Sequence, residues 1–251
     1  MTDTMDREKI KHDFNRDGFV IVPQFFDPKQ LQQIHEELDR YMKMLPQLPV
    51  ESAFYEDKSD PSSLKRLDQL GKDDYFHNLL KQSPWVILVE YLMGQPMESK
   101  GIMMFANPPR IGKKTPPHQD GYYYMIEPNE AAMTWLALDE VDESNGCVCY
   151  VPGSHRRGLR DHKVSNVLGF SLSVADYGPE DAALEVSACV HPGDLIVHHS
   201  LTIHSAQANN SNRRRWAIGC EYRSTLVKED LAKREAHNQM MKKAWAEQDK
   251  F

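Results

Sequence analysis

The chain has 251 residues, 40% of them hydrophobic and 27% charged, with a formal net charge of −7 at pH 7. That length can bury a full core, and a β-sandwich of this size is often one domain. The acidic balance argues against nucleic acid or an anionic membrane as the main partner. No apolar run is long enough to span a bilayer, so we also expect no membrane partner.

The two ends of the chain and its cysteines point to a cytoplasmic protein. Residues 1–12 are polar and mixed in charge, unlike a secretory signal. The last four residues differ from a peroxisomal address. The cysteines form no Cys-x-x-Cys pair, and we expect them to be reduced thiols in or near the core.

The first predicted elements are a short strand and a helix. An Asp17-Gly18 turn precedes an apolar strand over 19–22. The helix starts at Pro28, where Asp27 can cap the first turn and Gln30 occupies the position of a capping-box partner. Apolar residues then recur at helical spacing: Leu31, Ile34, Leu38 and Tyr41.

Further along, the composition predicts a loop over 45–63 and a second helix over 84–93, ending at Gly94. Residues 100–224 are short strand-like runs broken by Pro, Gly and Asn, and 227–248 are helical again. This order predicts a mostly β fold with flanking α-helices, and a double-stranded β-helix, or jelly roll, fits it best. We expect one domain over 1–251, divided into a helical part (1–95), a jelly-roll core (96–224) and a C-terminal helix (227–248).

The first candidate metal ligands are His118 and Asp120, which follow Thr115-Pro116-Pro117. Residues at i and i+2 share a face only on a strand, and the prolines disfavour a helix here. A histidine and a carboxylate supply two ligands of the facial triad that suits iron(II) in oxygenases.

The third ligand of such a triad is a more distant histidine. His204 is the best candidate, because it follows a Pro-Gly-Asp turn and an apolar strand. His198 and His199 compete with it, and His199 could instead line the pocket.

Arg215 is a candidate anion anchor eleven residues after His204. A keto acid that chelates a metal leaves a carboxylate at its other end, which a buried guanidinium can bind in a forked geometry. Arg213 and Arg214 are expected to be solvated, since a run of arginines is usually a basic turn.

Several motifs in order carry a family resemblance. They are His118-Gln119-Asp120, 134–139, Asn145-Gly146-Cys147, 151–155, Gly193-Asp194, His204, Asn209 and 215–218. Over about residues 12–224 the chain resembles the phytanoyl-CoA dioxygenase family of iron(II)/2-oxoglutarate oxygenases. The resemblance implies a jelly-roll core, iron(II) held by His118, Asp120 and His204, 2-oxoglutarate held by Arg215, and O2 as the second co-substrate.

The resemblance also implies lesser contacts with the co-substrate. Trp135 matches a pocket aromatic, Met103 a neighbour of the co-substrate, and Lys65 a lysine that reaches the same site. Trp135 and Met103 could equally be core residues, and Lys65 a surface charge. Ala206 departs from the pattern, since some members carry a hydroxyl there. Candidates for a replacement hydroxyl are Ser205, Thr202 and the tyrosines at 122–124.

These features predict an Fe(II)- and 2-oxoglutarate-dependent dioxygenase that hydroxylates an unactivated C–H bond of a small organic molecule and releases succinate and CO2. The alternatives are a non-oxygenase metal enzyme of the same jelly-roll shape and a catalytically inactive small-molecule binder. Basic residues near the expected cavity mouth could steer an anionic substrate. They are Lys113, Lys114, Arg156, Arg157, Arg160 and Lys163. Neither the substrate nor the oligomeric state follows from the sequence.

Overall fold

The structure is a computed structural model, and it describes residues 6–81, 84–167, 170–236 and 239. Within these residues, no helix has the length and apolar character that a membrane crossing requires. The helices are α1 (Arg7–Asp17), α2 (Pro28–Met44), α3 (Asp74–Lys81), α4 (Trp85–Met93), α5 (Gly121–Tyr124) and α6 (Pro179–Ala182).

The strands dominate the chain from residue 97 onward. They are β1 (Phe19–Val22), β2 (Ala53–Tyr55), β3 (Leu64–Leu67), β4 (Met97–Asn107), β5 (Thr115–His118), β6 (Ile126–Glu127), β7 (Ala131–Ala137), β8 (Val148–Tyr150), β9 (His162–Val167), β10 (Phe170–Val174), β11 (Val186–Ala188), β12 (Leu195–His199), β13 (His204–Ala206), β14 (Arg215–Ser224) and β15 (Lys228–Glu229).

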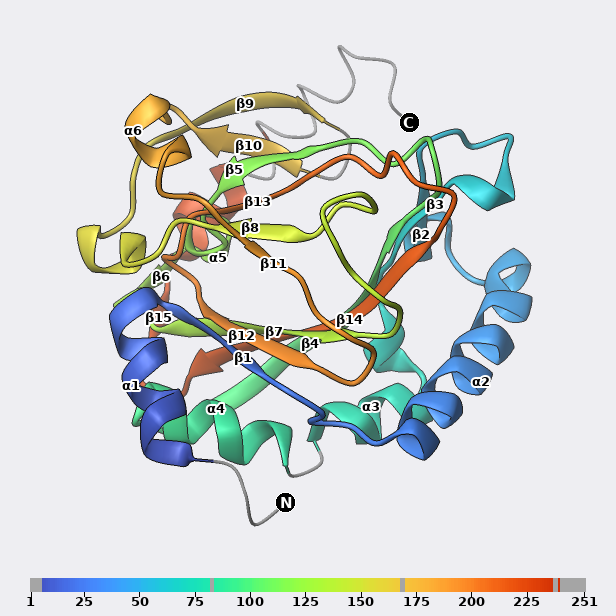
Figure 1. Cartoon of the computed structure of the whole chain (residues 1–251), viewed down its shortest axis with the longest axis horizontal. Helices are drawn as coiled ribbons and strands as arrows, with labels where there is room; N and C mark the ends of the chain where they lie inside the picture. The colour runs from blue at the N-terminus through green and yellow to red at the C-terminus, as the bar shows by residue number, and fades with distance from the viewer. Residues whose placement is uncertain (1–5, 82–83, 168–169, 237–238, 240–251) are drawn as a thin grey trace.

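Two antiparallel sheets form the centre of the fold. The major sheet has the strand order β1-β12-β7-β14-β4-β3-β2, and the minor sheet has the order β11-β8-β13-β5. Figure 1 shows the minor sheet facing one side of the major sheet, while α2, α3 and α4 lie along the other side. This is the mostly β, helix-flanked jelly-roll arrangement that the sequence predicted.

Strand alternation divides the apolar residues between two layers of core. On β7, Leu136 packs toward the helices, whereas Trp135 and Ala137 face the minor sheet. On β14, Ile218 and Ala217 divide in the same way. Because successive side chains on a strand point to opposite faces, the inward row of β14 also includes Arg215. A charged side chain is thereby carried between the sheets.

The helix over Pro28–Met44 matches its sequence signals. Asp27 accepts a hydrogen bond from the Gln30 backbone at 2.9 Å, and the Gln30 side chain accepts one from the Asp27 backbone, also at 2.9 Å. The four apolar residues at helical spacing are the buried ones: Leu31, Ile34, Leu38 and Tyr41. This face anchors α2 against the outside of the major sheet.

The predicted division of the chain was wrong in three places. The first 95 residues supply three strands of the major sheet; β1 matches the strand predicted over 19–22, whereas β2 and β3 were not predicted. The expected loop over 45–63 contains β2, a strand of three residues that is too short to show an alternating pattern. Helices α1 and α3 were not predicted.

The expected C-terminal helix also begins later than residue 227. Lys228–Glu229 pairs with β6 as a two-residue strand, and helix is found over 231–236. The rest of the predicted helix, apart from residue 239, lies outside the described residues. Residues 228–229 form backbone hydrogen bonds with β6 instead of starting a helix. The charge-rich composition of this segment did not indicate such a pairing.

The capping box makes a direct prediction about stability. Asp27→Ala removes the acceptor for the Gln30 amide, so we expect the free energy of unfolding to fall by about 1 kcal/mol. Urea unfolding followed by circular dichroism measures this change. Asp27→Asn keeps an acceptor and is the matched control. Equal stability of the Ala and Asn variants would contradict the assignment.

Candidate metal centre and anion pocket

Two histidines lie directly opposite each other on adjacent strands of the minor sheet. His118 ends β5 and His204 begins β13, and the antiparallel register pairs them directly. Their ring centroids are 4.2 Å apart. The strand pairing therefore brings together residues that are 86 positions apart in the sequence.

Asp120 completes a cluster that could hold a metal ion. Its Oδ1 lies 3.5 Å from His118 Nε2 and 3.8 Å from His204 Nε2. One ligand atom from each of the three residues falls within 4.8 Å of the others. Among the residues that the structure describes, no other group of His, Cys, Asp or Glu meets this criterion.

Asp120 does not lie on the strand, contrary to the expectation from sequence. The strand ends at His118, and Asp120 has helical backbone angles just before α5. The intervening Gln119 is fully buried, and its side-chain amide donates to the carbonyls of Gly158 and Leu201 at 2.9 and 2.7 Å. Gln119 thus holds the turn that carries Asp120 toward the histidines. In the sequence, only the position of Gln119 between two ligand-type residues pointed to this structural role.

Backbone carbonyls orient both imidazoles. His118 Nδ1 lies 2.9 Å from the Pro116 carbonyl, and His204 Nδ1 lies 3.0 Å from the Thr202 carbonyl. A carbonyl can only accept, so each Nδ1 carries the proton and each Nε2 presents a lone pair. Both lone pairs are on the side that faces Asp120.

The electrostatics favour the metal-binding protonation states. Burial, together with the neighbouring His118, lowers the pKa of His204 well below its usual range, so the imidazole is neutral. Burial alone would raise the pKa of Asp120, but the surrounding imidazoles, His204 first, hold it well below its usual range. A neutral imidazole and an ionised carboxylate are the forms that bind a divalent cation.

His198 does not join the cluster as a ligand, although the sequence made it a candidate. Its Nε2 lies 3.0 Å from Asp120 Oδ2, the oxygen that does not face His118 and His204. Its Nδ1 lies 3.0 Å from the Tyr150 hydroxyl. His199 points elsewhere, since its Nδ1 accepts from the Leu201 backbone at 3.1 Å. Tyr150 was not identified from the sequence.

Arg215 lies in the cavity beside the metal cluster. Its side chain is buried, and its guanidinium carbon is 5.4 Å from the centroid of the Trp135 ring. Its Nε has no hydrogen-bond partner, and no carboxylate of the described residues lies within 4.0 Å of it. Burial lowers the pKa of Arg215 to about 10, which still leaves it charged at neutral pH. A buried cation without a counter-charge is expected to bind an anion.

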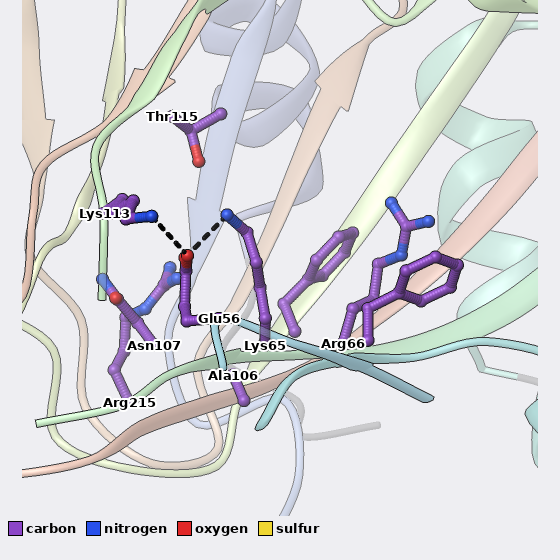
Figure 2. A pocket seen from close by; sticks show the side chains of 10 residues that line it. Glu56, Lys65, Arg66, Ala106, Asn107, Lys113, Thr115 and Arg215 are labelled. Carbon is purple, nitrogen blue, oxygen red and sulfur yellow. Dashed lines mark hydrogen bonds and ion pairs between the residues drawn. The ribbon is translucent and has the colours of Figure 1, made fainter. Parts of the chain in front are cut away.

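Arg215 also lines a second pocket next to the cavity of the metal cluster, and we call it the lysine pocket. Its polar lining consists of Glu56, Lys65, Arg66, Asn107, Lys113, Thr115 and Arg215. Figure 2 shows Lys65 and Lys113 converging on the Glu56 carboxylate, with Nζ–Oε distances of 2.8 and 3.3 Å. Lys65 and Glu56 are almost fully buried, so Lys65 is not the surface charge that the sequence left open. Glu56 was missed because it follows a strand that was predicted as loop.

The two pockets share three lining residues, Phe105, Thr115 and Arg215. Thr115 lies directly opposite Ala206 in the β5–β13 register. Thr115 therefore places a hydroxyl opposite position 206, where some members of the resembled family carry a hydroxyl themselves. Three of the five hydroxyls proposed from sequence bond elsewhere: Thr202 to the Gly18 carbonyl, Ser205 to Glu185, and Tyr123 to the Leu172 carbonyl.

Met103 and the two neighbouring arginines complete the set of sequence candidates. Met103 lies on the inward row of β4, but Phe105 of the same row is the residue that lines the cavity. Arg213 and Arg214 are about half exposed and pair with Asp142 and Asp139, as expected for solvated residues.

Several of the basic residues that were expected near the cavity mouth have partners in the fold. Arg157 and Arg160 both pair with Asp181, at 3.3 and 2.8 Å. Arg156 donates to the backbone carbonyls of Asn15 and Arg16. Lys113 faces Glu56 in the lysine pocket. The field expected from these side chains is therefore weaker than their number suggests.

This combination of sheets and site can now be compared with known proteins. Residues 14–217 match the family model described as phytanoyl-CoA dioxygenase (PhyH). The chain belongs to the phytanoyl-CoA dioxygenase family. It is 24% identical to the peroxisomal phytanoyl-CoA dioxygenase of Mus musculus over 237 residues, covering 88% of this chain and 69% of that one. As a member of this family, it is an oxidoreductase.

Two solved structures share the fold. EvdO2 from Micromonospora carbonacea var. aurantiaca, complexed with 2-oxoglutarate, superposes with a TM-score of 0.72 at 23% identity, covering 91% of this chain and 94% of that one. The epimerase SnoN, in complex with Fe3+, alpha ketoglutarate and nogalamycin RO, superposes with a TM-score of 0.69 at 24% identity. The match covers 89% of this chain and 85% of that one.

The isolation of Arg215 makes a prediction about stability. Arg215→Met removes a buried charge without a carboxylate partner, so we expect the ligand-free protein to gain about 1 kcal/mol and its Tm to rise by about 2–4 °C. Differential scanning calorimetry measures the shift. Arg214→Met, which alters an exposed and paired arginine, should give no increase. A lower Tm for Arg215→Met would show that the guanidinium is compensated in the folded chain.

Proposed function

We propose that the protein is an iron(II)- and 2-oxoglutarate-dependent oxygenase acting on a small organic molecule. The observation that carries the proposal is the adjacency of two features in one cavity. A His118–Asp120–His204 cluster with the facial-triad donor set lies beside Arg215, a buried cation that forms no ion pair with the described residues. A metal site alone would suit several kinds of chemistry, but a buried arginine next to it suits a chelating acid.

In this proposal, the three clustered residues hold iron(II). Each histidine offers a neutral Nε2, and Asp120 offers one oxygen on the same side. Bound iron(II) with 2-oxoglutarate and O2 supplies the oxidising power for C–H bond cleavage, releasing succinate and CO2. The protein contributes geometry and a cavity from which most water is excluded.

Arg215 is proposed to bind the far carboxylate of 2-oxoglutarate. Trp135 confines the guanidinium from one side, and Thr115 offers a hydroxyl at the junction of the two pockets. Lys65 can add positive charge, although in the ligand-free chain Glu56 neutralises it. Met103 is a weaker candidate for a contact than Phe105, which lines the cavity.

The oxidation is proposed to be hydroxylation of an unactivated C–H bond. The jelly-roll neighbour SnoN is an epimerase, so the same fold also serves other outcomes. A non-oxygenase metal enzyme of this shape would have no use for the buried Arg215, and an inactive binder would have no need of a complete metal cluster. Oxygen uptake that depends on 2-oxoglutarate separates the oxygenase from both alternatives.

The substrate is proposed to be a small molecule, and its charge is a separate question. The pairing of Arg157 and Arg160 with Asp181 weakens the support for an anionic one. Lys114 and Lys163 are exposed, and Lys163 donates to the Ala175 carbonyl. Product analysis by mass spectrometry over a panel of neutral and acidic compounds, with succinate formation as the common readout, identifies the class.

Removal of a proposed ligand should abolish turnover. His118→Ala, Asp120→Ala and His204→Ala should each eliminate 2-oxoglutarate-dependent oxygen uptake, because a triad with a missing ligand holds iron poorly. Oxygen electrode measurements test this, and circular dichroism verifies the fold. His199→Ala is the matched control and should retain uptake. Full activity in any of the three variants would remove that residue from the metal site.

Removal of the proposed anchor should raise the co-substrate requirement. Arg215→Ala deletes one partner of a buried charge pair, which typically costs roughly 3–5 kcal/mol, so the KM for 2-oxoglutarate should rise at least a hundredfold. Mn(II) binding should persist. Arg213→Ala and Arg214→Ala, which alter exposed pairs, should change the KM little. An unchanged KM in Arg215→Ala would show that another cation, such as Lys65, is the anchor.

A further inference from the structure

The two carboxylate oxygens of Asp120 have different environments. Oδ1 faces the imidazoles of His118 and His204, at 3.5 and 3.8 Å. Oδ2 faces away from them and lies 3.0 Å from His198 Nε2. We propose that His198, supported by Tyr150, is a positioning residue that restricts Asp120 to binding the metal through one oxygen. The inference rests on the proposed function, since it assumes that Asp120 is a metal ligand.

The direction of the hydrogen bonds follows from the carboxylate. An ionised carboxylate only accepts, so His198 Nε2 carries the proton and donates to Oδ2. The Tyr150 hydroxyl then meets the other ring nitrogen, Nδ1, at 3.0 Å. A tyrosine hydroxyl is both donor and acceptor, so at this distance it can donate to the unprotonated Nδ1.

His198 and Tyr150, which we call the relay, are both buried and closely packed. His198 is 3% exposed and Tyr150 is fully buried. The Tyr150 ring stacks on Phe19 with centroids 4.3 Å apart and an interplanar angle of 11°. His198 lies on β12 of the major sheet, between β1 and β7, while Tyr150 is paired with His204 in the minor sheet. The relay therefore connects the two sheets at the level of the metal cluster.

A carboxylate restricted to one oxygen has a chemical consequence. A metal ion held by two histidines and one oxygen of Asp120 would keep its remaining positions open to a chelating acid and to O2. If Asp120 bound through both oxygens, one of these positions would be lost. The hydrogen bond from His198 to Oδ2 would therefore keep that position available.

The experiment compares Mn(II) binding in wild type, His198→Phe, His198→Gln and Tyr150→Phe. Removing an outer partner of a metal ligand typically weakens metal binding by about 10–100-fold, which is the loss expected for His198→Phe by titration calorimetry. His198→Gln keeps an amide donor in reach of Oδ2 and should recover much of the affinity. His199→Phe, at the neighbouring position, is the matched control and should bind as wild type does.

Water-proton relaxation by bound Mn(II) provides a second readout that a merely structural role would not change. In His198→Phe, Asp120 is free to bind through both oxygens, so the metal should carry one inner-sphere water fewer than in wild type. Tyr150→Phe should have a smaller effect, and that effect should disappear in the His198→Phe background, because Tyr150 acts only through His198. Circular dichroism and the Tm of the metal-free variants check that each one folds.

The outcomes separate the inference from the function on which it rests. If wild type binds Mn(II) but His198→Phe matches it in affinity and in relaxation, the positioning role is wrong and the metal site stands. Independent, additive effects of the two substitutions would also overturn the relay. If wild type itself binds no divalent metal, the proposed function fails and this inference fails with it.

Discussion

The pairing of β13 with β5 is the interaction on which the rest of the site depends. It sets His204 opposite His118, and a slip of one residue would turn every side chain of β13 to the other face of the minor sheet. The register is held from both sides, because β13 also pairs with β8, where Tyr150 lies opposite His204. The cluster is therefore a property of the sheet, and only Asp120 depends on a turn, which the buried Gln119 secures.

The same layered arrangement explains why the cavity combines stable packing with an unfavourable charge. The inward row of β14 contributes small residues near the middle of the sheet, such as Ala217, and a guanidinium at its start. Burying Arg215 without a carboxylate partner costs stability, and only a ligand can compensate for that cost. Glu56 shows the alternative solution in the adjoining pocket, where a buried lysine has an internal counter-charge. The contrast between Lys65 and Arg215 supports the proposal that Arg215, and not Lys65, binds an exogenous acid.

Much of this could be predicted from sequence where a residue's position follows from local pattern. The jelly-roll class, the capping box of α2 and the three clustered residues all rest on spacing, turn residues or motif order. The sequence favoured His204 as the third ligand but left His198 and His199 as competitors, because His198 and His199 end an apolar run of the same region. Only the register shows that His204 faces His118 and that His198 reaches the far oxygen of Asp120.

Tertiary contacts explain the remaining differences. Glu56 follows a three-residue strand without a visible period, and Thr115 precedes prolines that conceal its strand. The arginines after residue 155 form a basic cluster in the sequence, but in the fold Arg157 and Arg160 pair with Asp181 and Arg156 donates to backbone carbonyls. Such pairings join residues that are distant in the chain, so no local pattern reports them.

The coupling of metal and keto-acid binding tests the central claim most directly. Titration calorimetry of wild type with 2-oxoglutarate, without metal and then with saturating Mn(II), measures that coupling as a change in Kd. If the metal cluster and Arg215 form one site, one Mn(II) should bind per chain and 2-oxoglutarate should bind measurably only when the metal is present. Binding of 2-oxoglutarate with the same Kd in both conditions would contradict the account, because the acid would then be held by cations alone.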